Sequence, residues 1–354
     1  MLKLDKISVT AGSFRLNNIS FRVEKGEYFV VLGPSGVGKS LLLETVAGLR
    51  QPDSGSIHLR GIDITRQRIQ KRNISIVYQD ADLFPHLSVH ENIAYPLRSR
   101  KERAIEDKVR RAADLVGIGD KLHRKPDTLS GGEYQRVSLA RSIAADSDII
   151  LLDEPLSSID SKARGELRAL LRSINRNGIT VIHVTHDYEE AISVASKIGI
   201  MEHGELVHVD APGEIFRHPK SEFVAHFIGV KNFFKGVLRS VPGSDLKVFT
   251  TNGLSIFCLT DVAGGEAFLM IGPEEISVSN SQLSTSSRNH FKGVIKDIAQ
   301  ARLGIEASID AGCEFVVTVT SEARKSLGLE IGNEVWISFK ASSCKIYRSD
   351  EAPS

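Results

Sequence analysis

The sequence has few cysteines and no excess of either charge, and each shortage excludes a class of protein. Only three cysteines occur among its 354 residues, Cys258, Cys313 and Cys344. Their spacing does not suit a metal site, so isolated buried thiols are expected. Lysine and arginine together number 45, and aspartate and glutamate 44. This balance argues against a dedicated nucleic-acid-binding protein, which carries a basic excess, and we expect no nucleic-acid partner.

Long hydrophobic runs are missing as well. No run approaches the roughly 18 apolar residues that a membrane-spanning helix needs. The N-terminal residues MLKLDKISVT lack the apolar core of a signal peptide. We therefore expect a cytosolic chain that reaches a membrane only by docking on another protein.

The first two thirds of the chain alternate strand-like and helix-like segments. Apolar runs at 28–32 and 149–152 and a β-branched run at 180–185 predict strands. The charged amphipathic pattern at 101–118 and the segment 163–175 predict helices. Short all-apolar strands are typical of parallel sheets covered on both faces, so the pattern predicts an α/β fold with a mostly parallel sheet.

The sequence pattern changes after about residue 229. Residues 230–354 hold short β-rich runs broken by Gly, Ser and Asn, so we divide the chain into a domain 1–229 and a domain 230–354. Within the second domain, Lys231–Leu238 (KNFFKGVL) matches Arg288–Ile295 (RNHFKGVI) almost residue for residue. Two similar small β units in tandem explain this match.

A glycine-rich segment between a predicted strand and a predicted helix carries the first chemical signal. It reads GPSGVGKS and fits the phosphate-binding pattern GxxxxGK[ST] in full. Backbone N–H groups of such a turn surround a β-phosphate, the lysine reaches the β- and γ-phosphates, and the serine holds Mg²⁺. The sequence therefore predicts ATP and Mg²⁺ as cofactors. The expected nucleotide ligands here are Gly33, Pro34, Ser35, Gly36, Val37, Gly38, Lys39 and Ser40.

Two carboxylates follow the apolar run 149–152. Asp153 stands where the strand is expected to end, which is a suitable place for a Mg²⁺ ligand together with Ser40. Glu154 comes next and is the candidate general base for the attacking water. A pair of this kind is often a solvated strand end, and it gains meaning here only from the phosphate loop upstream.

The segment Leu129–Glu133 (LSGGE), continued by Tyr134-Gln135-Arg136, resembles the signature sequence of ABC ATPases. The resemblance implies a P-loop NTPase core with a helical subdomain at about 83–145. In this family ATP lies between two chains, and Ser130, Gly131 and Gly132 would contact the γ-phosphate held by the other copy. A functional homodimer is therefore expected.

Further family motifs occur in the expected order. Gln79 resembles the glutamine that contacts Mg²⁺ and senses the membrane partner, and His186 resembles the switch histidine at the γ-phosphate. The segment 157–160 (SSID) resembles the D-loop that ends in Asp160, with two conservative departures. An aromatic residue that stacks on adenine is missing at Thr10–Gly12, where Phe14 is either a substitute or a core residue.

The segment 79–95 resembles the part of importer ATPases that receives a helix of the membrane subunit. Its apolar residues are either a docking groove or the core of the helical subdomain, and both can hold at once. The resemblance implies two membrane-embedded permease subunits as partners, a solute-binding protein indirectly, and a peripheral place on the cytoplasmic side of the cell membrane.

The C-terminal domain narrows the family. Ser286–Val294 (SSRNHFKGV) and Phe339–Ser343 (FKASS) are similar to molybdate-binding β domains, and Ile271–Ile276 (IGPEEI) is similar to an element of importer regulatory domains. The resemblance implies an all-β, OB-like regulatory domain of two repeats that senses the oxyanion whose import the chain energises, molybdate or tungstate. A role in dimerisation alone is the alternative. The oxyanion ligands implied are Ser287, Arg288, Asn289, Lys340, Ala341, Ser342 and Ser343.

Two alternative functions remain open at this point. The chain could serve an importer for sulfate, a sugar, a polyamine or ferric iron. It could also be an ABC ATPase that acts on DNA or ribosomes, although such proteins carry a coiled-coil insertion or tandem ATPase domains that this sequence lacks.

Overall fold

The computed structural model describes residues 1–79, 83–157, 159–301 and 304–348. The chain forms two compact units, Met1–Ile215 and Phe216–Ser354, which are described separately. The boundary predicted near residue 229 falls after helix α8 (Glu222–Phe227) and stays a prediction.

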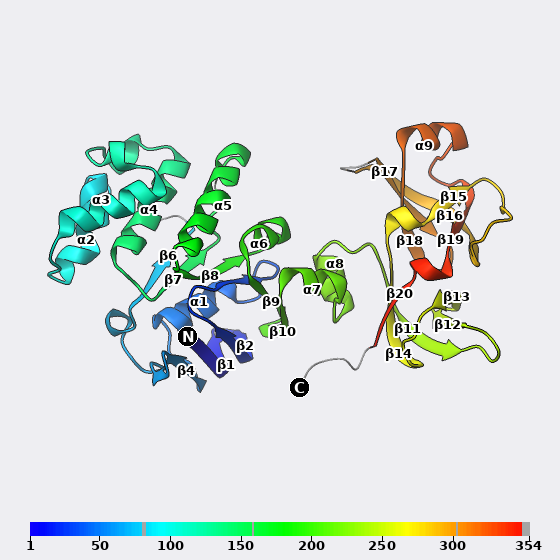
Figure 1. Cartoon of the computed structure of the whole chain (residues 1–354), viewed down its shortest axis with the longest axis horizontal. Helices are drawn as coiled ribbons and strands as arrows, with labels where there is room; N and C mark the ends of the chain where they lie inside the picture. Colours follow the sequence, from blue (N-terminus) through cyan, green and yellow to red (C-terminus); the bar gives the residue numbers. More distant parts are fainter. Residues whose placement is uncertain (80–82, 158, 302–303, 349–354) are drawn as a thin grey trace. The chain divides into compact units, whose positions relative to one another are not determined.

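A six-stranded sheet forms the centre of the first unit (Figure 1). Its order is β10 (Glu205–Asp210), β9 (Lys197–Glu202), β3 (Tyr28–Leu32), β8 (Thr180–Thr185), β7 (Ile149–Asp153) and β6 (Ile74–Val77). All neighbours are parallel except β10 and β9. Every residue of β3, β7 and β8 is buried, which explains the apolar runs of β3 and β7, whereas β8 also buries the polar residues Thr180, His183 and Thr185. The three strands predicted at these positions are confirmed.

A second, antiparallel sheet completes the core of this unit. Its order is β2 (Phe14–Val23), β1 (Leu2–Ala11), β4 (Ser54–Leu59) and β5 (Ile62–Asp63). Most apolar residues of β1 and β2 are buried, and the ring of Phe21 stacks on that of Phe29 at 4.7 Å. One apolar cluster therefore joins the two sheets. The sequence prediction did not include this separate antiparallel sheet.

Helices lie around the sheets. They are α1 (Lys39–Ala47), α2 (Val89–Ser99), α3 (Ile105–Val116), α4 (Gly131–Ala144), α5 (Ser161–Arg176) and α6 (Tyr188–Val194). Helix α7 (Pro212–Arg217) contains the boundary between the two units. Figure 1 shows α2, α3 and α4 as a group beyond the β6 edge of the sheet. Helix α3 buries Val109, Ala112, Ala113 and Val116, an i, i+3, i+4, i+7 pattern, and starts later than the predicted position 101. Among the described residues, no helix combines the length and the apolar composition needed to cross a membrane.

The second unit contains two five-stranded antiparallel sheets. One has the order β13 (Leu254–Leu259), β12 (Leu246–Thr251), β11 (Asn232–Ser240), β14 (Gly265–Ile271) and β20 (Lys345–Arg348). The other has the order β18 (Glu314–Val319), β17 (Ile305–Asp310), β16 (Asn289–Gln300), β19 (Glu334–Phe339) and β15 (Ser277–Ser279). The segment Ser321–Leu327 forms a helix, α9, that the β-rich pattern did not predict.

The two repeats exchange their last strands. Strand β15 follows the first repeat but pairs with β19 of the second, and β20 ends the second repeat but pairs with β14 of the first. The exchange combines the two repeats into one apolar core. This arrangement explains how two units that are each too small for a core of their own become stable.

A buried asparagine at the start of each matching segment reinforces the exchange. Asn232, unexposed, exchanges hydrogen bonds with the backbone of Val316 at 2.7 and 2.8 Å. Asn289, 1% exposed, does the same with the backbone of Phe257 at 2.8 and 2.9 Å. Each side chain holds an edge strand of the other repeat.

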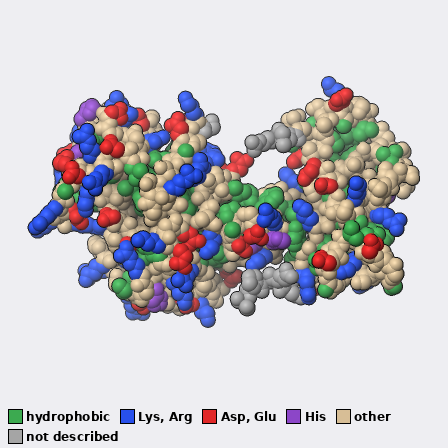
Figure 2. Space-filling model, viewed as in Figure 1, with side chains coloured by type: hydrophobic (Ala, Val, Ile, Leu, Met, Phe, Trp, Pro, Cys, Tyr) green, Lys and Arg blue, Asp and Glu red, His purple; other side chains and the backbone are tan. Residues whose placement is uncertain are grey.

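Charges of both signs are interspersed on the face of the molecule that Figure 2 shows. This mixture agrees with the net charge of +1.

Candidate functional site

The loop Gly33–Ser40 connects β3 to α1, as the sequence predicts. Gly36 and Gly38 have φ angles of 83° and 95°, which only glycine adopts without strain. A Cβ on Gly38 would stand 2.5 Å from Cε1 of Phe14, whereas a Cβ on Gly36 would meet nothing within 4 Å. Phe14 therefore supports the underside of the loop, and its role at adenine stays a prediction.

Lys39 folds back onto its own loop. Its ammonium group donates to the carbonyl oxygens of Gly33 and Pro34 at 2.8 Å each, and lies 3.8 Å from Oε1 of Glu154. Burial lowers the pKa of Lys39, while the charges of Glu154 and Asp153 oppose that shift. The Lys39 side chain is 5% exposed, and its hydrogen-bond acceptors are the carbonyl oxygens of its own loop.

Ser40 and Asp153 meet directly. The hydroxyl of Ser40 donates to Oδ1 of Asp153 at 3.0 Å. Asp153 ends β7 and is 9% exposed, and burial raises the pKa of its carboxyl more than the Ser40 hydrogen bond lowers it. A nearby cation stabilises the ionised form of a carboxylate that is desolvated in this way.

Glu154 and His186 form the second polar pair. Nδ1 of His186 lies 3.1 Å from Oε2 of Glu154, although the two residues follow different strands, β8 and β7. The Glu154 backbone has a φ of 44°, a left-handed conformation that is strained for glutamate, and its N–H donates to Val184 O at 3.0 Å. The His186 side chain remains 52% exposed. The structure thus brings the candidate base and the candidate switch residue into contact.

Gln79 and Asp160 are further candidate residues of the ATP site. Gln79 is exposed two residues beyond β6, which pairs in parallel with β7, so it emerges at the same sheet edge as Asp153. Asp160 caps α5, where its Oδ1 accepts from the N–H groups of Lys162 and Ala163. Ser158, within the predicted D-loop, lies outside the described residues.

The signature turn stands at the start of α4. Ser130 caps the helix, accepting from Glu133 N while the Glu133 carboxylate accepts from Ser130 N at 2.9 Å. A Cβ on Gly131 would meet nothing within 4 Å. The turn therefore offers open backbone at a helix N-terminus, which favours an anion.

These groups fit a nucleoside triphosphate and Mg²⁺. The loop has left-handed glycines, and Gly36 leaves open space where a side chain would otherwise stand. The Lys39 ammonium group rests on loop carbonyls that a phosphate can replace, and Ser40 and Asp153 supply two oxygen ligands of the kind that Mg²⁺ prefers.

Part of the segment 79–95 forms an aromatic cluster between the turn before α2 and α2 itself. The rings of Phe84 and Tyr95 lie 4.5 Å apart, and the Arg141 guanidinium lies 5.7 Å above the Phe84 ring. Tyr95 is 49% exposed. Asn92, fully buried, bonds to the Phe84 backbone and so fixes the turn before the helix. Residues 80–82 lie outside the described residues.

The candidate anion ligands of the second unit meet at one end of a sheet. Asn289 pairs with Phe339 in the register of β16 and β19, so Arg288 and Lys340 flank this end on neighbouring strands. Both are exposed, as is Ser342. Ser287 is half-buried, and its carbonyl oxygen lies 2.8 Å from Nε2 of His290. Two cations and a hydroxyl thus lie near one another.

Three members of the predicted anion set are otherwise engaged. The Asn289 side chain holds Phe257, and Ala341 is buried at 8% exposure. The Ser343 hydroxyl donates to Oε2 of Glu275 at 2.8 Å. Sequence reasoning missed Glu275, although aligning the two repeats places Glu274-Glu275 of the first opposite Ser342-Ser343 of the second.

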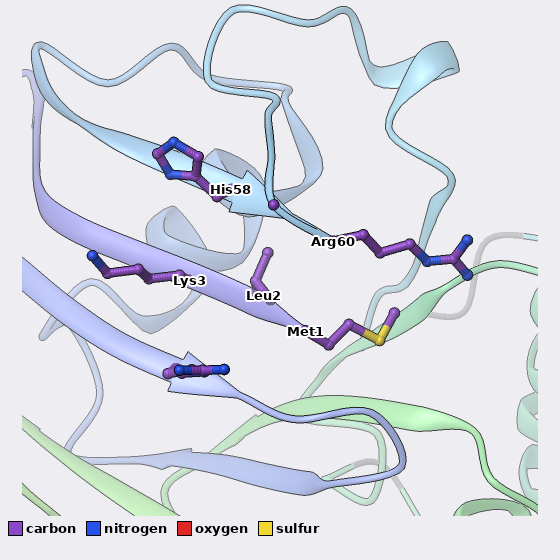
Figure 3. Close-up of a pocket in the computed structure, with 7 residues that line it drawn as sticks. Met1, Leu2, Lys3, His58 and Arg60 are labelled. Carbon is purple, nitrogen blue, oxygen red and sulfur yellow. The ribbon is translucent and has the colours of Figure 1, made fainter.

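A further cavity of about 470 Å³ lies against the antiparallel sheet of the first unit. Figure 3 shows Lys3 and His58 on neighbouring strands, with the Arg60 side chain extending away from both. Lys3 pairs with Asp5 at 2.8 Å, and Arg60 pairs with Asp148. Carboxylates of the same chain already neutralise these cations, so we assign no ligand to this cavity.

Comparison with protein families gives two matches. The ABC transporter family model matches residues 16–157, and the TOBE domain model matches residues 285–346. The first match covers the phosphate loop, the signature turn and the Asp153-Glu154 pair. The second covers the candidate anion residues.

Curated relatives match nearly the whole chain. It is 37% identical to the molybdate/tungstate import ATP-binding protein WtpC of Pyrococcus abyssi and 41% identical to that of Pyrococcus horikoshii. Both alignments cover 98% of this chain and 100% of the relative. The spermidine/putrescine import ATP-binding protein PotA of Protochlamydia amoebophila is 41% identical, over 81% of this chain and 79% of that protein.

Solved structures resemble the first unit in fold. One is cbiO1 from Clostridium perfringens, part of the ABC transporter complex cbiONQ, with a TM-score of 0.58 and 28% identity over 61% of this chain and 90% of that chain. Another is a dimeric ATP-binding cassette in a post-hydrolysis state with ADP and Pi bound, with a TM-score of 0.53 and 29% identity over 60% of this chain and 99% of that chain.

Proposed function

Because the chain belongs to the family of ATP-binding subunits of ABC transporters, we propose that it hydrolyses ATP between two copies and thereby drives import of molybdate or tungstate. The observation that carries the ATPase proposal is the contact between Glu154 and His186 at 3.1 Å, beside Lys39 and the Ser40–Asp153 pair. A base, a γ-phosphate sensor and phosphate ligands are the groups that this reaction needs.

The reaction follows from the roles of these side chains. On ATP binding, Lys39 would exchange its bonds to loop carbonyls for the β- and γ-phosphates. Ser40, Asp153 and Gln79 would hold Mg²⁺, which supplies positive charge to the phosphates. Glu154 would accept the proton of the attacking water, and His186 would hold the γ-phosphate. Closure around ATP replaces the present contacts between protein groups.

The second copy would complete the site. Its Ser130, Gly131 and Gly132 would cover the γ-phosphate, with Asp160 near the interface. The open backbone at Gly131 and the capped start of α4 support this arrangement. The dimeric nucleotide-bound cassette of similar fold is consistent with it.

Complementation between two inactive variants tests the composite site. Lys39→Ala removes the phosphate ligand, and Gly131→Arg fills space that is open in its own copy. Each variant alone should lack ATPase activity. A mixture should regain part of the activity, because one of the two sites in a mixed dimer carries both changes and the other carries none. Inactive mixtures that nevertheless contain mixed dimers would contradict the shared site.

The surface of Phe84 and Tyr95 would receive the permease. Two membrane-embedded subunits would dock at residues 79–95 and hold the chain at the cytoplasmic side of the membrane, with a solute-binding protein as an indirect partner. The exposed Tyr95 ring on α2, beside the Phe84 turn that Asn92 fixes, supports this site. Tyr95→Asp should weaken co-purification with the permease without lowering the ATP affinity of the isolated chain.

The second unit would bind the transported oxyanion and report its concentration. Arg288 and Lys340 would supply positive charge and Ser287 and Ser342 would supply donors, while Asn289 and Ala341 are buried next to them along the chain. A tetrahedral dianion suits such a set.

A polyamine is the alternative cargo, because a spermidine/putrescine import protein is also a relative, with 41% identity over 81% of this chain. Its cationic ligand would be repelled by Arg288 and Lys340. Calorimetry on the full chain with molybdate, tungstate, sulfate and spermidine distinguishes these cargoes. Heat with molybdate or tungstate that disappears in Arg288→Gln supports the oxyanion, and heat with spermidine alone would contradict it.

A further inference from the structure

Four polar side chains lie in the core of the first unit, where apolar ones would be expected. Tyr28 and His183 are unexposed, Thr185 is 1% exposed and Glu190 is 4% exposed. Buried polar groups destabilise a fold unless they bond to one another, and apolar residues often fill such a space at no loss of stability. Their presence here therefore calls for a physical reason.

The four side chains form a continuous chain of contacts. The Tyr28 hydroxyl lies 3.0 Å from Nδ1 of His183, and Nε2 of His183 lies 3.0 Å from Oε1 of Glu190. The Thr185 hydroxyl donates to the other oxygen of Glu190 at 2.9 Å. In the tautomer that carries the imidazole proton on Nε2, Nδ1 of His183 accepts from the Tyr28 hydroxyl. Nε2 and Oε1 of Glu190 are in close contact without hydrogen-bond geometry. Burial raises the pKa of Tyr28 well above its usual value, which keeps this hydroxyl a donor.

The chain of contacts ends on both sides of His186. Asp187 N donates to the Thr185 hydroxyl oxygen at 3.0 Å, and Glu190 N donates to Oδ1 of Asp187 at 3.0 Å. The residues before and after His186 are therefore fixed, while the His186 ring itself is half exposed and touches Glu154. This geometry holds the backbone and leaves the imidazole free to meet a phosphate.

The same contacts connect His186 to the phosphate loop. Tyr28 begins β3, which runs directly into Gly33, and Gly33 N donates to Thr185 O at 3.3 Å. Glu190 lies on α6, which packs against β3. One buried network thus spans the two elements that would hold opposite sides of the γ-phosphate.

We propose that Tyr28, His183, Glu190 and Thr185 are positioning residues that set the location of His186 relative to the phosphate loop during ATP hydrolysis. The inference rests on the proposed ATPase reaction and deepens it. All four residues are buried and none is among the candidate nucleotide ligands, so their effect would reach the reaction through His186.

Thr185 offers a matched pair of variants. Thr185→Val keeps the shape and removes the hydroxyl, whereas Thr185→Ser keeps the hydroxyl. In the full chain, Thr185→Val should lower kcat about 10- to 100-fold with KM for ATP unchanged, because a displaced group costs rate in this range. Thr185→Ser should retain most of the activity. Equal losses in both variants would overturn the proposal.

A double substitution distinguishes positioning from general support of the fold. In a His186→Ala background, Thr185→Val should lower kcat little further, because the residue through which it acts is gone. The same fold-loss in both backgrounds would overturn the proposal. Wild-type activity of His186→Ala would instead contradict the proposed role of His186 itself, so the two failures are distinguishable.

Tyr28→Phe and Glu190→Gln test the rest of the network. If Thr185→Val does not fold, Tyr28→Phe still tests the proposal. Both variants should lower kcat without raising KM for ATP. Tyr28→Phe should have the smaller effect, because Tyr28 stands at the end of the chain of contacts that is farthest from His186. Glu189→Gln, an exposed neighbour on α6, is the matched control. Loss in the control equal to that of Glu190→Gln would count against the network.

Discussion

The two candidate anion sites differ in how the groups that would bind the anion are held before it binds. In the first unit, the groups meant for ATP contact one another: Lys39 faces Glu154, and Ser40 bonds to Asp153. In the second unit, the cations Arg288 and Lys340 stand at a sheet end, while the Ser343 hydroxyl bonds to Glu275. The first site thus depends on backbone shape and paired charges, and the second depends on side chains with a competing carboxylate close by.

The two repeats of the second unit show the same contrast on a smaller scale. At the sheet end where one has Arg288 opposite Lys340, the other has Lys231 opposite Gly272. Where one continues with Ser342-Ser343, the other continues with Glu274-Glu275. The two repeats have the same fold, but their side chains at this sheet end differ in charge. This difference explains why the second repeat carries a candidate anion site and the first does not.

Removal of the candidate base should have the largest effect. Glu154→Gln should lower ATP turnover roughly 10²- to 10⁴-fold, because it removes the proton acceptor for the attacking water. ATP binding should persist, and a closed dimer should accumulate in size-exclusion chromatography with ATP. Turnover near the wild-type rate would remove Glu154 from the mechanism, and the exposed Glu189→Gln serves as control.

Substitutions at two glycines of the phosphate loop distinguish a steric clash with Phe14 from backbone strain alone. Gly38→Ala places a Cβ 2.5 Å from the Phe14 ring on a residue whose backbone is left-handed. It should lower the unfolding free energy by about 1–3 kcal/mol and weaken ATP binding. Gly36→Ala has only the backbone strain, about 1 kcal/mol. Urea denaturation and nucleotide titration measure both. Equal effects would show that Phe14 does not constrain the loop.

The buried asparagines test the strand exchange of the second unit. Asn232→Ala and Asn289→Ala should each cost about 1–3 kcal/mol, because buried backbone groups lose their partners. Asn232 also donates to Ile271 O at 3.2 Å, so its loss should cost at least as much. Thermal unfolding of the full chain gives the comparison. An unchanged melting temperature in both variants would argue against their role as clamps.

The smallest effect is expected at the competing carboxylate. Glu275→Gln should raise oxyanion affinity roughly 2- to 5-fold at low salt, because an exposed charge acts weakly. Its neighbour Glu274→Gln should change the affinity less, and high salt should reduce the difference between them. Calorimetry with molybdate on the full chain decides. A lower affinity in Glu275→Gln would indicate that this carboxylate supports the site rather than opposes it.

Most of the first unit's candidate site could be predicted from sequence. Lys39, Asp153, Glu154 and His186 are close in space because each stands at the end of a parallel strand or at the start of a helix that follows one. Such positions meet at one sheet edge whatever the details of packing. The β-rich second domain with two repeats was equally visible, since the matching segments form the corresponding strands β11 and β16.

The sequence did not show what the anion candidates contact. Asn289 belongs to a motif that suggests a ligand, yet its amide holds Phe257, 32 positions away. Helix α9 lies within a β-rich pattern, and its seven residues are too few for a clear helical period. Exchange of β15 and β20 between repeats leaves no local signal at all.

The local pattern alone determined the phosphate loop, the order of the motifs and the family, because phosphate binding uses backbone groups whose conformation a short glycine-rich segment encodes. Only the tertiary structure decided that Tyr28 contacts His183 across 155 positions, that Phe14 supports Gly38, and that Glu275 faces Ser343. These contacts depend on which strands become neighbours, and that choice follows from packing the whole core.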